Sequence, residues 1–308
     1  MRTLCPLLLL AVLLECGCPA RISEDPPALP EFTSVSATNA LAAATELVRG
    51  FTPRDAGTDG ARNASVWIRD ELGKRGVKTE LNEFNQHTPR GLLPMRNVIG
   101  TIPGSGDRWI VLLSHFDTVS TAPVGFEGAN DGASSTGLLL ELGRLLQSSA
   151  PLRHSVMLGF TDGEECMLAY TPRDGLHGSK RISADLKRRR CQVDAVILLD
   201  MVGDRDLKLR LPYNSTAKLR VLALEAADAV GLRDYIGLYD GHILDDHQPF
   251  LDAGFPAVDL IDFEFGSAPG LNDYWHTAAD TLDKISADSL LVTGKIVMEM
   301  IRHLDAAD

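Results

Sequence analysis

Short apolar runs alternate along this chain with amphipathic segments long enough to be helices. The apolar runs are bounded by polar or turn-forming residues, which is typical of buried strands. The predicted strands cover Lys78–Phe84, Asn97–Ile102, Trp109–Leu113, Ser155–Phe160, Ala195–Leu199 and Ala257–Ile261. The predicted helices cover Ala37–Arg49, Gly60–Arg75, Ser134–Leu146, Ser179–Arg188, Thr216–Val230, a short segment after Asp246, and Ser286–Leu304.

This alternation restricts the fold strongly. Strands that are separated by helices of ten or more residues usually pair in parallel, and their sheet is covered on both faces. We therefore expect an α/β protein, a three-layer α/β/α sandwich around a central, mostly parallel but mixed sheet. In such sheets, ligands bind at the carboxyl ends of the strands.

Charge and composition exclude some classes of function. The chain has 308 residues, 44% hydrophobic residues and a formal net charge of −12. Hydrophobic content of this size is enough for a substantial core, whereas nucleic-acid binding requires a basic surface. The one basic run, 187–190, is expected to be the solvated end of a helix, so no nucleic-acid partner is expected.

The first residues resemble a secretory leader. Met1 and Arg2 precede the short apolar stretch Leu7–Leu14, which is too short to span a bilayer comfortably. We expect a signal peptide over residues 1–20, a proline- and acid-rich tether over 21–32, and one domain over 33–308. The mature protein is then expected to be exported to a periplasmic, extracellular or secretory compartment and to have no membrane span. The sequence leaves open whether the protein is anchored through its leader, by a lipid on Cys16 or Cys18.

Acidic and histidine residues gather where several predicted strands end. His115 and Asp117 follow one strand, the pair Glu164 and Glu165 follows the next, and Asp200 follows a third. Because these strand ends should converge, the side chains should form one site. Histidine and carboxylate groups from separate loops are typical zinc ligands, and an additional carboxylate can transfer protons.

Two further patches complete the set. Asp131 lies in a glycine-flanked segment before a helix, where it could cap the helix or approach a metal, and His276 follows Trp275. The two adjacent glutamates are expected to have different roles, because neighbouring side chains rarely reach the same atom. Cys166 and Cys191 remain after loss of the leader, and the sequence leaves open whether they pair.

Residues 96–308 resemble the zinc-dependent peptidase clan that includes the co-catalytic zinc aminopeptidases and the glutaminyl cyclases. The resemblance rests on the six positions His115, Asp131, Glu164, Glu165, Asp200 and His276. It implies that Asp131, Glu165 and His276 bind metal and that Glu164 is the acid/base. It also implies that His115, Asp117 and Asp200 either complete a second metal site or support the first.

Three features favour the glutaminyl cyclase branch. An aromatic-bearing insertion lies between the glutamates and Gly178, the segment 244–251 resembles the cyclase Asp-Asp-His-x-Pro-Phe stretch, and Trp275 precedes His276. Two departures are Tyr170 in place of a cyclase tryptophan, and Ser114 with Thr136 in place of a cysteine pair found in some animal cyclases. The implied substrate pocket consists of Tyr170, Leu244, Leu271 and Trp275.

The resemblance implies a glutaminyl-peptide cyclotransferase that uses one zinc ion on the N-termini of peptides or proteins, with the chain acting as a monomer. Glu164 would transfer the proton, and Asp200 and Asp245 would hold the cationic amine. The alternative is a dizinc aminopeptidase that uses the same residues to activate water. A non-catalytic relative would have lost ligands, and none of the six is missing.

Overall fold

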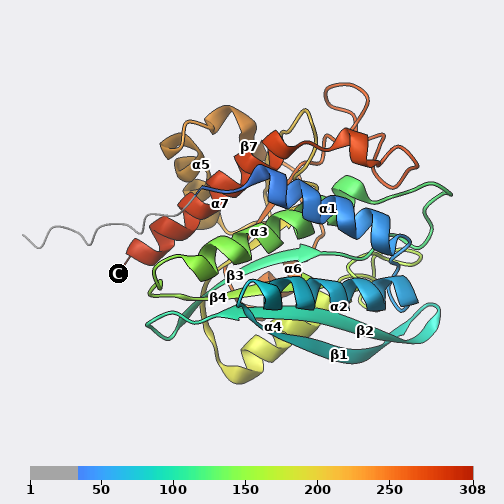
Figure 1. The fold of residues 1–308 in the computed structure, drawn as a ribbon, viewed down its shortest axis with the longest axis horizontal. Coiled ribbons are helices and arrows are strands. Elements are labelled where there is room, and N and C mark those ends of the chain that lie inside the picture. The colour runs from blue at the N-terminus through green and yellow to red at the C-terminus, as the bar shows by residue number, and fades with distance from the viewer. Residues whose placement is uncertain (1–33, 308) are drawn as a thin grey trace, which may run out of the picture.

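The computed structural model describes residues 34–307 and has three layers, with helices on both faces of a twisted sheet (Figure 1). The predicted signal peptide and the whole predicted tether, with Cys16 and Cys18, lie outside the described residues. Within the described residues, no helix combines the length and the apolar character needed to cross a membrane. The expected α/β/α architecture is confirmed.

The central sheet has eight strands in the order β1-β2-β4-β3-β5-β8-β6-β7. Four of its seven pairings are parallel, β4·β3, β3·β5, β5·β8 and β6·β7, and the other three are antiparallel. The strands are β1 (Lys78–Thr88), β2 (Gly91–Ile102), β3 (Arg108–His115), β4 (Ser155–Thr161), β5 (Gln192–Asp200), β6 (Leu209–Pro212), β7 (Ile236–Tyr239) and β8 (Ala257–Ile261). The sheet is therefore mixed with a parallel centre, as predicted.

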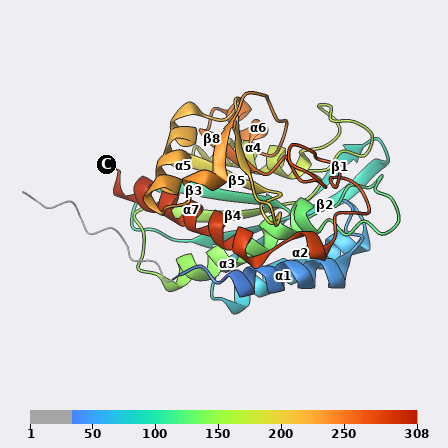
Figure 2. The same ribbon diagram turned by 90° about the horizontal axis from the view of Figure 1, so that it is seen from above.

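Helices α1, α2, α3 and α7 cover one face of the sheet and α4 and α6 cover the other (Figure 2). Helix α5 packs against α7 near β7. The helices are α1 (Ala37–Phe51), α2 (Asp59–Lys74), α3 (Ser135–Ser148), α4 (His177–Arg189), α5 (Ala217–Ala229), α6 (Gln248–Ala253) and α7 (Ala287–Ala306). The basic run 187–190 ends α4, in agreement with the prediction.

The sequence did not predict two of the strands, β6 and β7. Strands β6 and β7 are four residues each, and β6 joins β8 through the single pair Arg210 and Ile261. Strands this short carry little periodicity, so pairing with their neighbours, rather than local pattern, defines them. Strand β7 is relevant to the site, because the segment that follows it carries Asp245.

A buried core lies around the central strands of the sheet. The inner strands β3 and β5 are almost wholly buried, and each buried leucine contributes about 2 kcal/mol through removal from water. Gly137 lets α3 approach α1 closely, since a side chain there would lie 2.7 Å from the Ala44 backbone nitrogen. Helix α3 thus has a fixed position, and so does the loop that precedes it.

Candidate active site

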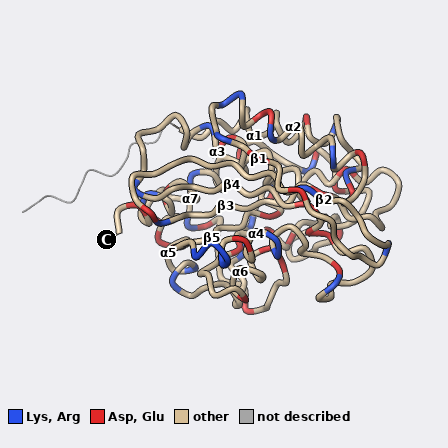
Figure 3. The backbone as a smooth tube through the Cα atoms, turned by 90° about the horizontal axis from the view of Figure 1, so that it is seen from below, with Lys and Arg blue, Asp and Glu red and all other residues tan. Residues whose placement is uncertain are grey.

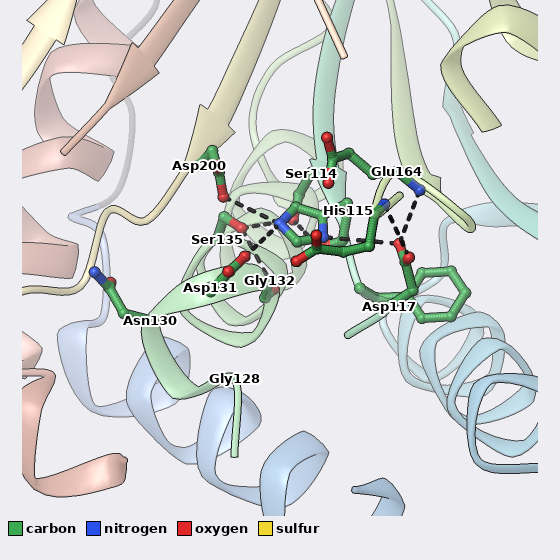
Figure 4. Close-up of polar contacts among 12 residues, drawn as sticks. Ser114, His115, Asp117, Gly128, Asn130, Asp131, Gly132, Ser135, Glu164 and Asp200 are labelled. Carbon is green, nitrogen blue, oxygen red and sulfur yellow. Dashed lines mark hydrogen bonds and ion pairs between the residues drawn. The ribbon is translucent and has the colours of Figure 1, made fainter. Parts of the chain in front are cut away.

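The carboxyl ends of three adjacent strands bring the predicted side chains together (Figure 4). His115 is the last residue of β3, Glu164 and Glu165 follow β4, and Asp200 is the last residue of β5. All four are buried. The convergence that the sequence predicted is therefore a consequence of the strand order β4-β3-β5.

His115 bridges two carboxylates. Its Nε2 atom lies 3.1 Å from Asp131 Oδ1 and 3.1 Å from Asp200 Oδ1. Its Nδ1 atom is 3.7 Å from Asp117 Oδ1, which is too long for a hydrogen bond. Although burial opposes it, the charge of Asp200 and contacts with Asp117 and Asp131 raise the pKa of His115 well above its usual range.

The loop that carries Asp131 is shaped by glycine and held by a buried acid. Gly128 and Gly132 have φ values of 59° and 86°, so the chain can turn Asp131 toward His115. The two oxygens of Asp280 accept hydrogen bonds from the backbone nitrogens of Asn130 at 2.7 Å and Asp131 at 3.1 Å. Burial raises the pKa of Asp280 to about 7.

A fully buried arginine holds the same loop from the other side. Arg54 donates to the carbonyl oxygens of Phe116 at 2.6 Å, Glu127 at 2.8 Å and Gly128 at 2.6 Å. Burial lowers the pKa of Arg54 to about 10, in opposition to nearby acids, of which Asp280 acts most strongly. Arg54 therefore connects the end of β3 to the Asp131 loop.

His276 meets Asp131 and Glu165 at the mouth of the site. Its Nε2 atom lies 3.1 Å from Glu165 Oε1 and 3.3 Å from Asp131 Oδ2. Its φ of 58° is left-handed, and its ring stacks on Trp275 with centroids 4.0 Å apart. Burial works against it, yet hydrogen bonds with Asp131 and Glu165 raise the pKa of His276 to about 10. The two carboxylates thus favour a cation at this point.

Two groups of side chains have the geometry of a metal site, and they share Asp131. One group is His115, Asp131 and Asp200, and the other is Asp131, Glu165 and His276. Donors that lie about 2.0 Å from a tetrahedral ion are about 3.3 Å from one another, close to the separations of the second group. Glu165 Oε2 is buried without a hydrogen-bond partner in the described part of the chain. The residues therefore fit a zinc ion.

Asp117 positions the paired glutamates. Its Oδ1 accepts a hydrogen bond from the Glu164 nitrogen at 3.1 Å, and its Oδ2 accepts one from the Glu165 nitrogen at 3.2 Å. The turn at Gly163, with a φ of 73°, precedes them. The two adjacent side chains thereby point to different places, as predicted, with Glu165 toward His276 and Glu164 toward Tyr170.

Glu164 is a buried carboxyl with an aromatic neighbour. The Tyr170 hydroxyl donates to its two oxygens, which are 3.0 and 3.3 Å away. Burial, followed by the charge of Glu165, raises the pKa of Glu164 well above its usual range. A carboxyl with a raised pKa can both accept and donate a proton near neutral pH.

More carboxylates lie behind Glu164. Burial and then the charges of Asp200 and Asp246 raise the pKa of Asp245 well above its usual range. Asp246, next to it, accepts a hydrogen bond from Thr161, and burial raises its pKa to about 6. Asp245 Oδ1 accepts the Asp246 backbone N–H at 2.5 Å. The charges of Asp245 and Asp246 in turn help to raise the pKa of Glu164.

A cavity of about 190 Å³ opens over the site. Its lining residues are Asp131, Glu164, Glu165, Tyr170, Asp200, Tyr239, His242, Ile243, Leu244, Asp245, Ile261, Phe263, Trp275 and His276. Of the four residues predicted to form the substrate pocket, Tyr170, Leu244 and Trp275 line this cavity. Leu271 does not line it and is 45% exposed, in the loop that follows β8.

Residues 97–301 match the family model for peptidase family M28. The chain belongs to this family. The M28 match spans the strands and loops that carry every residue of the two donor groups, and the predicted resemblance to the zinc aminopeptidase clan is confirmed.

Glutaminyl cyclases are among the family members to which this chain is similar. Glutaminyl-peptide cyclotransferase from Drosophila melanogaster is 28% identical over 302 residues, which cover 88% of this chain and 82% of the relative. The crystal structure of Acidobacteriales bacterium glutaminyl cyclase has a TM-score of 0.84 and 34% identity, and the match covers 91% of this chain and 98% of that one. The predicted resemblance to the cyclase branch is thereby confirmed.

A second solved structure is similar to this chain but has a different activity in its name. The Zn-dependent exopeptidase from Parabacteroides distasonis has a TM-score of 0.79 and 27% identity, and the match covers 88% of this chain and 99% of that one. The name of that protein states that it depends on zinc. The similarity means that the fold alone does not separate a cyclase from a peptidase.

Sequence reasoning missed the residues that hold the ligands. Asp280 and Arg54 contact the Asp131 loop from 149 and 77 residues away, so no local pattern marks them. The cysteine question is settled for the described residues, in which Cys166 and Cys191 are both unpaired. Ser114 and Thr136 lie side by side, with their hydroxyl oxygens 3.1 Å apart.

Proposed function

We propose that this protein is a zinc-dependent glutaminyl-peptide cyclotransferase, which converts an N-terminal glutamine to pyroglutamate and releases ammonia. The observation that carries the proposal is the buried Glu164 carboxyl, which faces the cavity beside the group Asp131, Glu165 and His276. The Tyr170 hydroxyl of the insertion contacts this carboxyl. The cyclotransferase and cyclase names of the similar proteins support the same activity.

One zinc ion is proposed, held by Asp131, Glu165 and His276. When bound, it polarises the side-chain carbonyl of the substrate glutamine. His115 would then remain in contact with Asp131 and Asp200 and hold both carboxylates in place. The cavity walls of Trp275 and Phe263, whose rings are 5.2 Å apart, would exclude water around the glutamine side chain.

Glu164 is proposed to move the proton. As the neutral α-amine nitrogen of the substrate attacks the side-chain amide carbon, Glu164 would accept a proton from that nitrogen. A new N–C bond forms, the bond to the amide nitrogen breaks, and Glu164 returns the proton to the departing ammonia. Asp200 and Asp245 would hold the amine while it is cationic, because both carboxyl groups line the cavity beside Glu164.

The second donor group supports one alternative, a dizinc aminopeptidase. His115, Asp131 and Asp200 could hold a second ion, and two ions that share Asp131 would activate a bridging water. The two readings differ in the bond that breaks: a peptidase cleaves the backbone amide, whereas a cyclase leaves it intact.

A parallel assay separates the two activities. Purified protein is given glutaminyl-β-naphthylamide and leucine-p-nitroanilide, and ammonia and arylamine are measured with the bound zinc. Ammonia release from the first substrate, with its arylamide intact, is expected. Release of arylamine without ammonia would replace the proposal with the aminopeptidase reading.

Export of the protein is also proposed, with residues 1–20 as its signal peptide and 33–308 as one catalytic domain that acts as a monomer. The basic start and short apolar stretch of the sequence support this. N-terminal sequencing of protein from the producing cell's envelope and medium tests it, because cleavage near Ala20 is expected.

A further inference from the structure

A second hollow opens beside the catalytic cavity, between the insertion and helices α4 and α6. Its volume is about 460 Å³. Helices α4 and α6 lie side by side (Figure 3), and both contribute residues to its lining. We call this hollow the insertion groove, and Tyr170, Lys180, Leu244, Gln248 and Asp252 are among the residues that line it.

The insertion groove borders the cavity over the candidate site. Tyr170 and Leu244 line both. The Tyr170 hydroxyl contacts Glu164, whereas its ring packs on Gly175, where an added Cβ would lie 2.6 Å from the ring. Tyr170 is therefore the wall between the two spaces, so a chain that leaves the cavity at Tyr170 enters the groove.

The groove is preformed, because a buried acid fixes the insertion. Asp174 Oδ1 accepts the Met167 backbone N–H at 2.8 Å, and Asp174 Oδ2 accepts those of Leu168 at 2.9 Å and Ala169 at 3.1 Å. The backbone nitrogen of Leu176 donates to the Glu164 carbonyl at 2.8 Å. An occupant would therefore bind without ordering the loop first, which favours affinity.

One cation faces this groove. Lys180 is partly buried at the start of α4, and its Nζ donates to the Gly175 carbonyl at 2.8 Å. Within residues 34–307 no carboxylate lies within 4.0 Å of it, and an ammonium has three protons to donate. Asp252 accepts a hydrogen bond from Gln248 at 2.8 Å and Asp174 accepts hydrogen bonds from the insertion backbone, while both carboxylates still attract the Lys180 ammonium from beyond 4.0 Å, as Asp246 and Glu164 do.

We propose that the insertion groove binds the second and third residues of the substrate peptide and that Lys180 selects an acidic side chain there. The inference rests on the proposed function and deepens it, since the N-terminal glutamine would occupy the cavity on the far side of Tyr170. Acidic peptides that begin with glutamine are therefore the substrate class for this enzyme.

The test uses amidated tetrapeptides that begin with glutamine and carry Glu, Gln or Lys at position two or three. For the wild-type protein, kcat/KM should be about 5-fold higher with Glu than with Lys at one of these positions, mainly through KM, as for a half-exposed ion pair. Lys180→Gln should abolish this preference, and Lys180→Glu should reverse it.

Two controls keep the outcomes distinct. Glutamine amide, which has no second residue, ends before the groove, so the Lys180 variants should cyclise it at the wild-type rate. Lys187→Gln, at the exposed far end of α4, should keep the preference for Glu. An unchanged Glu-to-Lys ratio in Lys180→Gln would overturn the groove assignment while cyclase activity stands, whereas absence of ammonia release from every substrate would overturn the proposed function itself.

Discussion

At the scale of single residues, the site assigns different tasks to two adjacent glutamates. Asp117 fixes the backbone of both, so that Glu165 meets His276 and Glu164 meets the Tyr170 hydroxyl. One side chain thus belongs to the proposed zinc site, and the other is a buried carboxyl that belongs to neither donor group. The same substitution at the two positions should therefore have different consequences.

Glu164→Gln keeps the size of the side chain and removes its basicity. Turnover should fall by roughly 10²- to 10⁴-fold, the usual loss for a general acid/base, while zinc remains bound. Glu165→Gln is the matched comparison, and it should lose zinc as well as activity. Metal analysis and kcat are measured on both. Zinc loss in Glu164→Gln, or full turnover with zinc retained, would contradict the assignment.

At the scale of elements, the loop of Asp131 depends on partners that are distant in the sequence. The alternation of strands and helices predicted β3, β4, β5 and the convergence of their ends, because local periodicity and parallel pairing determine both. It did not predict that Arg54, just before α2, and Asp280, just before α7, hold the loop. Their role arises only when α1, η1 (Ala129–Ser134) and the last loop pack together, and single charged residues in loops give no pattern.

Arg54→Lys should loosen this loop. Lysine retains the charge but cannot donate to three separate carbonyls in the planar arrangement of a guanidinium. We expect unfolding free energy to fall by about 2–4 kcal/mol, and zinc affinity to fall by about 10- to 100-fold. Urea unfolding and zinc titration measure the two. Arg62→Lys, an exposed pair with Asp59 on α2, is the control and should change stability by less than about 0.5 kcal/mol.

The loop after β8 contains a buried carboxyl, Asp262, whose titration should make the stability of the protein depend on pH. Asp262 accepts backbone hydrogen bonds from Lys208 at 2.7 Å and Glu264 at 3.0 Å, and burial raises its pKa to about 7. The folded protein then holds this proton between about pH 4 and pH 7, so the contribution of Asp262 to stability is present at low pH and is lost as the pH rises through 7.

Relative to Asp262→Asn, the wild type should lose roughly 1.4 kcal/mol of unfolding free energy per pH unit across that window. Other titrating groups are common to both proteins and cancel in the difference. Urea unfolding at pH 5, 6, 7 and 8 gives the values, and a flat difference for Asp262→Asn would refute the raised pKa.

At the scale of the whole molecule, many acids are buried around one point. The net charge of −12 suggested no nucleic-acid partner, but composition alone could not show that Glu164, Glu165, Asp200, Asp245 and Asp246 would all lie in the interior. Burial raises the pKa values of these carboxyls, with Glu165 at about 8. The unmetallated site therefore holds protons at neutral pH, and a metal ion has to displace them.

Zinc should consequently stabilise the protein more as the pH rises. Because zinc has to displace the proton of Glu165, the apparent zinc dissociation constant should fall up to tenfold for each pH unit below about 8. Tighter zinc binding then raises Tm by mass action. The difference in Tm between zinc-loaded protein and protein treated with 1,10-phenanthroline should therefore be larger at pH 7.5 than at pH 6. Asp131→Asn removes a ligand common to both donor groups and should abolish the difference at either pH. If chelation leaves Tm unchanged at both pH values, these carboxylates hold no structural zinc, and the acids must be kept in the interior by protons alone.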